Sequence, residues 1–93
     1  MTEKQMLNVL MCIVNEARDN IIIYGDHPNI SADEVTLPLI DTYNKTRKIA
    51  LSKGWFDNDV LDNDFIIELP NEASLNDVKW AAAVLSQFIS EHK

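Results

Sequence analysis

Lys45, Arg47, Lys48 and Lys53 lie within nine positions and are half of the lysine and arginine residues of this chain. No acidic residue lies among them. Cations near the carboxyl end of a helix are favoured by the helix macrodipole, which alone would explain the cluster. The functional alternative is a phosphorylated ligand such as a nucleotide, because the planar guanidinium of Arg47 can form two hydrogen bonds with one phosphate. Lys45, Arg47 and Lys48 are therefore a candidate anion-binding site.

The segment 55–73 has the opposite charge, with six acidic residues and no basic residue. Its spacing suggests an EF-hand calcium loop that begins at Asp57, but Leu61 stands at a ligand position and Asp62 replaces the turn glycine. We therefore expect a solvated acidic loop, with a weak divalent-cation site as the alternative. Such a loop would steer a basic partner toward the protein by long-range attraction. The carboxylates expected to do so are Asp57, Asp59, Asp62 and Asp64.

The residues that most often perform catalysis or bind zinc are isolated in this sequence. Cys12, His27 and His92 lack the spacing of zinc ligands. His27 follows Asp26 in a turn, where a general base could stand, but an Asp-His-Pro sequence is more typical of a simple turn. Cys12 has apolar neighbours in a helical pattern, so we expect it to be packed rather than reactive. The sequence predicts no enzyme, no cofactor and no metal.

Hydrophobic periodicity predicts three helices, at residues 3–24, 32–53 and 75–91. Apolar side chains recur at steps of three and four along each of them, as on one face of a helix. The predicted core residues are Met6, Leu10, Ile13, Ala17, Ile21 and Tyr24 in the first helix, Leu39, Ile40, Tyr43, Ala50 and Leu51 in the second, and Leu75, Val78, Ala81, Ala82, Leu85, Phe88 and Ile89 in the third.

Capping and breaking residues mark the helix boundaries. Gly25 ends the first helix and Pro28 prevents its continuation. A capping box at 31–34 opens the second helix, which Pro38 either kinks or divides. Ser74 and Asp77, at 74–77, cap the third. The fold is therefore predicted to be mainly α, with three helices and a long acidic connection in which 64–69 is a candidate short strand or an extended clip across the helices.

Residues 20–24 allow a rival interpretation, because their isoleucine run is β-branched. If they formed a strand and paired with 65–69, the fold would be α+β with a two-stranded sheet. The unbroken helical period through Tyr24 favours the helix.

Apolar residues outside the predicted core indicate a surface that needs covering. On a helical wheel Trp80 lies roughly opposite the core stripe of its helix, with Val84 beside it. Three helices in one short chain cannot surround one of their own, so either the segment 55–73 or another chain must cover this surface. Tryptophan is typical of binding surfaces. The predicted protein-interface residues are Trp80, Val84, Met11, Ile22 and Ile23, with Val9 and Cys12 also outside the main stripe of the first helix.

The composition is that of one small acidic domain, residues 1–93, with a formal net charge of −7 and a single cysteine. This charge argues against direct binding to nucleic acid, and no apolar run approaches the length of a membrane span. A lone cysteine and no targeting segment predict the cytoplasm.

This general type resembles the small acidic helical inhibitors, antitoxins and immunity proteins that act on a larger partner. The resemblance is one of composition and covers no particular residues. The surplus of apolar surface beside the uncompensated acidic segment predicts a non-enzymatic protein that occupies a surface of a macromolecular partner, as a homo-oligomer. Sequestration of a phosphorylated ligand at the basic cluster is the alternative function.

Overall fold

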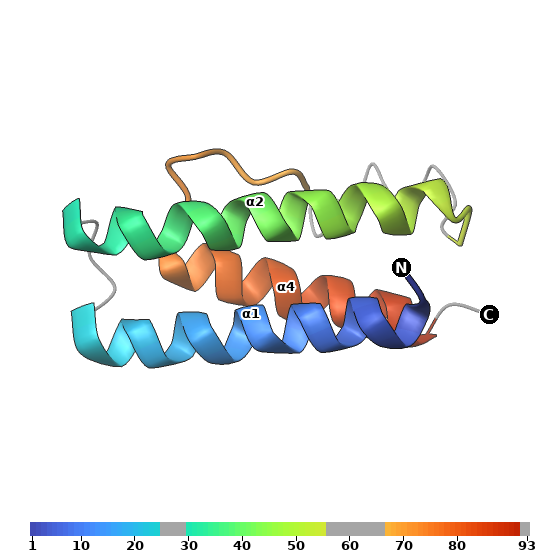
Figure 1. Cartoon of the computed structure of the whole chain (residues 1–93), viewed down its shortest axis with the longest axis horizontal. Coiled ribbons are helices and arrows are strands. Elements are labelled where there is room, and N and C mark those ends of the chain that lie inside the picture. Colours follow the sequence, from blue (N-terminus) through green and yellow to red (C-terminus); the bar gives the residue numbers. More distant parts are fainter. Residues whose placement is uncertain (25–29, 56–66, 92–93) are drawn as a thin grey trace.

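The computed structural model describes residues 1–24, 30–55 and 67–91. These residues form three helices, α1 (Glu3–Tyr24), α2 (Ile30–Ser52) and α4 (Leu75–Glu91). α1 runs antiparallel to α2 and α4, so that the N-terminus and the end of α4 lie at the same end of the molecule (Figure 1). The predicted mainly α fold is confirmed, and the predicted bounds of the first and third helices match the structure.

The core lies between one face of each helix, and α1 packs most extensively against α4. The predicted stripes supply this core. The side chain of Tyr24 is not described, and Leu51 is half-buried. Every other predicted core residue is buried or packs against the buried cluster. Val9 also packs against this cluster, so it belongs to the core margin and not to a free surface. Helical periodicity therefore located the core correctly.

α1 and α4 begin at side chains that satisfy backbone N–H groups of the first turn. At α4 the Ser74 hydroxyl accepts from the Asp77 N–H at 3.1 Å, and the Asp77 carboxylate accepts from the Ser74 N–H at the same distance. Thr2 and Gln5 exchange the equivalent pair of bonds at α1. Each reciprocal pair is a capping box, which makes the helix start unambiguous. The box at Ser74 follows the sequence prediction, and the one at Thr2 was missed.

α2 passes through Pro38 as one continuous helix, beginning two residues before its predicted start. The Thr42 hydroxyl donates to the Pro38 carbonyl at 2.9 Å, and the buried Thr46 hydroxyl donates to the Thr42 carbonyl at 2.8 Å. These local bonds let polar side chains sit along the helix without unsatisfied groups. Gly54, at a φ of 72°, ends α2 in the left-handed region that glycine adopts easily.

The α+β alternative is wrong for the part of the chain that the structure describes, which contains no strand. Residues 20–24 are the last turn of α1, where the Asn20 amide donates to the Glu16 carbonyl at 2.8 Å. Residues 67–70 are extended, but they run along α2 and not beside another strand (Figure 1). We refer to residues 67–73, which lead from this extended segment into α4, as the strap.

Candidate functional site

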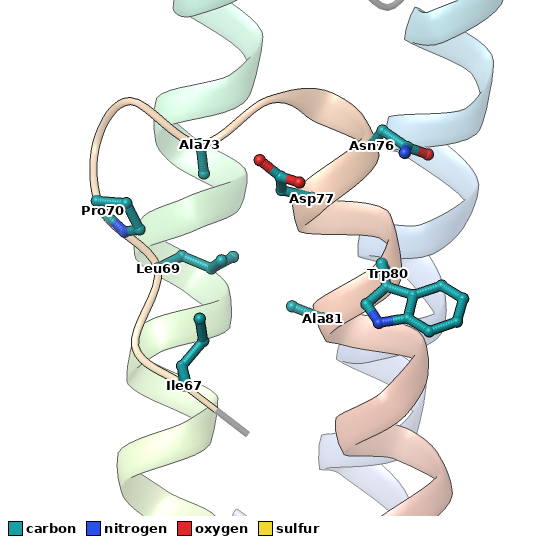
Figure 2. A pocket seen from close by; sticks show the side chains of 8 residues that line it. All are labelled: Ile67, Leu69, Pro70, Ala73, Asn76, Asp77, Trp80 and Ala81. Carbon is teal, nitrogen blue, oxygen red and sulfur yellow. The ribbon is translucent and has the colours of Figure 1, made fainter. Parts of the chain in front are cut away.

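An apolar groove of about 510 Å³ lies between the strap and the first turns of α4. Figure 2 shows Leu69 of the strap and Ala81 of α4 pointing toward each other across it. Its volume falls in the range of roughly 300–1,000 Å³ that is usual for ligand-binding sites. The residues that line it are Ile67, Leu69, Pro70, Ala73, Asn76, Asp77, Trp80 and Ala81.

The first wall of the groove is α4, which the core holds in place. Val78, Ala82 and Leu85 on its inner face are fully buried, so the backbone that carries Trp80 is anchored by apolar packing. The helix begins at the capping box, which sets the position of Asp77 at one end of the groove.

The second wall is the strap, which polar side chains of α2 hold. The Asn44 amide donates to the Leu69 carbonyl at 3.0 Å, and its oxygen accepts from the Leu69 N–H at 2.9 Å. One amide side chain thus satisfies both backbone groups of Leu69, as a partner residue does in a hydrogen-bonded strand pair. The Tyr43 hydroxyl donates to the Ile67 carbonyl at 2.9 Å.

Tyr43 is completely buried, and burial raises the pKa of its hydroxyl from 10.0 to about 12, although the nearby Arg47 charge acts in the opposite direction. The hydroxyl therefore keeps its proton, and with it the bond to Ile67, to a higher pH than an ordinary tyrosine does. Leu69 is also buried, so both polar and apolar contacts fix this wall.

Trp80 lies at the edge of the groove with 63% of its surface exposed, and Ile67 of the strap is 47% exposed. Segment 55–73 was one of two candidates to cover Trp80, and its described part leaves the indole accessible. Val84, the predicted neighbour of Trp80, is half-buried and does not line the groove.

The other predicted interface residues lie on α1 and do not line the groove. Met11 is 53% exposed, Ile22 78% and Ile23 69%. Cys12 is exposed as well, so the prediction that it is packed is wrong. Its position outside the core stripe of α1 was the better guide, because a helix buries only the side chains on its packed face.

The predicted anion site is not assembled into the groove. The Lys45 ammonium lies 2.9 Å from the Asp41 carboxylate one turn earlier, and both side chains are exposed. Arg47 is half-buried and acts on Tyr43, while Lys48 is exposed. Lys45 thus already has an anionic neighbour, and binding of a phosphorylated ligand here stays a prediction.

The predicted steering carboxylates Asp57, Asp59, Asp62 and Asp64 lie outside the described residues, as do His27 and His92. Within the described ranges, no three His, Cys, Asp or Glu side chains converge in the manner of a metal site. No helix in these ranges combines the length and apolar character needed to cross a membrane.

Sequence analysis predicted a short strand or an apolar clip across the helices at 64–69, and the described part of this segment runs along α2 without forming a strand (Figure 1). It did not predict the side chains that hold the segment, because Tyr43 was predicted only as a core residue and Asn44 was not singled out. The alternation of apolar Ile67 and Leu69 with polar Glu68 fits an extended segment with one packed face.

The fold and this site define an all-α protein with an apolar groove between a helix and an extended segment. No protein-family description, no curated protein and no solved structure matches this chain. The function must therefore be argued from the groove itself.

Proposed function

We propose that this protein is a non-enzymatic binding protein that occupies a surface of a macromolecular partner through the groove beside Trp80. The observation that carries the proposal is the exposure of the Trp80 indole next to the exposed Ile67 on an anchored apolar groove. An exposed tryptophan on a rigid scaffold has little conformational freedom to lose when a partner buries it.

The lining of the groove favours binding through apolar burial. Asn76 and Asp77 are its polar side chains, and both lie at the first turn of α4. Apolar grooves with few polar groups typically receive apolar side chains presented by a helix or an extended segment of a partner. A protein that acts in this way inhibits or masks its partner by occupying the surface that another molecule would use.

The proposal includes self-association through a second surface on α1. Ile22 and Ile23 are exposed neighbours there, and Met11 is exposed about three turns earlier; large exposed apolar side chains are typical of protein contacts. Sedimentation of the wild type and of an Ile22→Ser, Ile23→Ser double variant tests this part. We expect an oligomer for the wild type and a monomer for the variant, and a monomeric wild type at high concentration would contradict it.

The groove is tested by affinity capture from native lysate with the wild type, Trp80→Ser and Leu37→Ser. Leu37 is the matched control, because it is also exposed and apolar but lies on α2 and does not line the groove. We expect wild type and Leu37→Ser to recover the same partner and Trp80→Ser to lose it, since truncation of a tryptophan that anchors an interface costs about 2 kcal/mol or more of binding energy.

Circular dichroism and chemical denaturation of the same three proteins serve as the folding control. Trp80 is mostly exposed, so Trp80→Ser should change the free energy of unfolding by no more than about 0.5 kcal/mol. Equal recovery of the partner by folded Trp80→Ser would refute the groove as the binding site.

A further inference from the structure

We infer that the occupant of the groove is a basic amphipathic segment of another protein, with apolar side chains in the groove and lysine or arginine side chains along its rim. This inference rests on the proposed function and adds the chemistry of the partner. It is argued from the charges around the groove and from the shape of its apolar lining.

The rim of the groove is acidic. Glu72 is an exposed residue of the strap next to Ala73, which lines the groove, whereas Glu68 lines a separate hollow with Asn44 and Asn71. Asp77 is exposed and lines the groove itself. Lys79 is the one base between residues 67 and 81, and it is half-buried and not part of the lining. Asp77 and Glu72, together with the formal net charge of −7 of the chain, therefore favour a cationic partner.

Asp77 can interact with a partner without giving up its role at the helix start. One carboxylate oxygen accepts from the Ser74 N–H, and within the described residues no second hydrogen bond occupies this side chain. Asp77 and Trp80 are three positions apart, so they lie on the same side of α4. A guanidinium or ammonium group at the groove mouth is attracted by the carboxylate, and the exposed indole face offers it a cation–π contact.

The same charges argue against a second copy of this chain as the occupant. Each copy has a formal net charge of −7, and a two-fold contact through the groove would bring two identical acidic rims together. Like charges placed opposite each other across an interface weaken it. A basic partner removes this repulsion and gains attraction in its place.

The apolar lining requires that the partner also carry large apolar side chains. Trp80 is exposed on the α4 wall and Ile67 on the strap, and Leu69 and Pro70 also line the groove from the strap. A purely basic segment would leave the apolar lining exposed to water, whereas a segment with apolar residues at helical spacing would bury it. Both properties together define an amphipathic basic segment.

The test measures the binding of three fluorescein-labelled helical peptides by anisotropy: one of leucine and lysine, one of leucine and glutamate, and one of serine and lysine. We expect the leucine–lysine peptide to bind wild type at least about tenfold more tightly than either of the others, because only it supplies apolar anchors and positive charge. Its binding should weaken steeply as salt rises to about 1 M, where the Debye length is about 3 Å.

Variants that replace one carboxylate by its neutral amide show which acidic side chains contribute to peptide binding. Asp77→Asn keeps an oxygen that can accept from the Ser74 N–H, and Glu72→Gln changes an exposed side chain, so both proteins should fold. Each should weaken binding of the leucine–lysine peptide about two- to fivefold, the range expected of an exposed ion pair. Glu16→Gln removes one charge from α1 instead and should leave the affinity unchanged.

The outcomes separate this inference from the proposed function. If the leucine–glutamate peptide binds as tightly as the leucine–lysine peptide and both are lost in Trp80→Ser, the groove is a binding site but its partner is not basic. If wild type self-associates and Trp80→Ser abolishes that, the occupant is a second copy and the inference is wrong. If no peptide binding depends on Trp80, both the inference and the proposed function fail.

Discussion

The helical wall of the groove and the strap opposite it are held in different ways. α4 presents Trp80 outward while its inner face packs Val78, Ala82 and Leu85 into the core. The strap inserts Leu69, and hydrogen bonds from Tyr43 and Asn44 of α2 hold its backbone. One wall depends on apolar burial shared with the whole fold, and the other on a few polar side chains.

This difference suggests that the stability of the bundle and the shape of the groove can be altered separately. Loss of a buried apolar group affects the whole cooperative unit, because the core is continuous through all three helices. Loss of a strap contact affects a segment whose opening need not unfold the helices. Two substitutions and one change of pH test this view, in order of the expected effect on stability.

Leu85→Ala should destabilise the protein by about 2–5 kcal/mol, because Leu85 is completely buried and its truncation leaves a cavity in the core. Urea denaturation followed by circular dichroism measures the loss. Hydrogen exchange should show the Leu69 amide and the core amides of α4 losing protection together. A loss below about 1 kcal/mol would mean that the inner face of α4 does not anchor its wall.

Asn44→Ala should remove both hydrogen bonds to Leu69 and leave its backbone groups unpaired, which costs about 1–3 kcal/mol locally. Hydrogen exchange should show faster exchange of the Leu69 amide while the core amides of α1 and α4 change less. Asn15→Ala is the matched control, since it makes the same change at an exposed position of α1. Equal protection of Leu69 in both variants would show that Asn44 does not hold the strap.

High pH should loosen the strap through Tyr43 by up to about 2 kcal/mol. Between pH 10 and 12 an unfolded tyrosine loses its proton, while Tyr43 in the folded protein keeps it because burial raises its pKa to about 12. The unfolded state then binds fewer protons than the folded state, so the free energy of unfolding falls as pH rises through this window, by at most about 1.4 kcal/mol per unit. Denaturation of wild type and Tyr43→Phe across this range measures the difference between them.

We expect the Tyr43→Phe variant to be slightly less stable than wild type at neutral pH, because it lacks the bond to Ile67. The two stabilities should converge as pH rises, since only the wild type has this group to ionise. Parallel pH profiles would contradict the raised pKa.

Much of the fold was predictable, and much less of the site. The stripes through Leu10, Tyr43 and Leu85 and the cap at Ser74 repeat within one or two helical turns, so each can be seen locally in the sequence. Trp80 was predicted at the outer face of its helix for the same reason. The role of Asn44 could not be predicted, because an asparagine on a helix carries no local sign of a distant backbone partner.

Helix positions, their buried faces and the place of Trp80 opposite the core stripe thus follow from the order of the amino acids alone, since helical periodicity is a short-range property. The tertiary structure alone decided that the strap lies along α2 and that its Ile67 faces the groove beside Trp80. The bonds responsible join residues 24 and 25 positions apart, from Tyr43 to Ile67 and from Asn44 to Leu69. Such pairings arise only when the packed helices bring the two segments together.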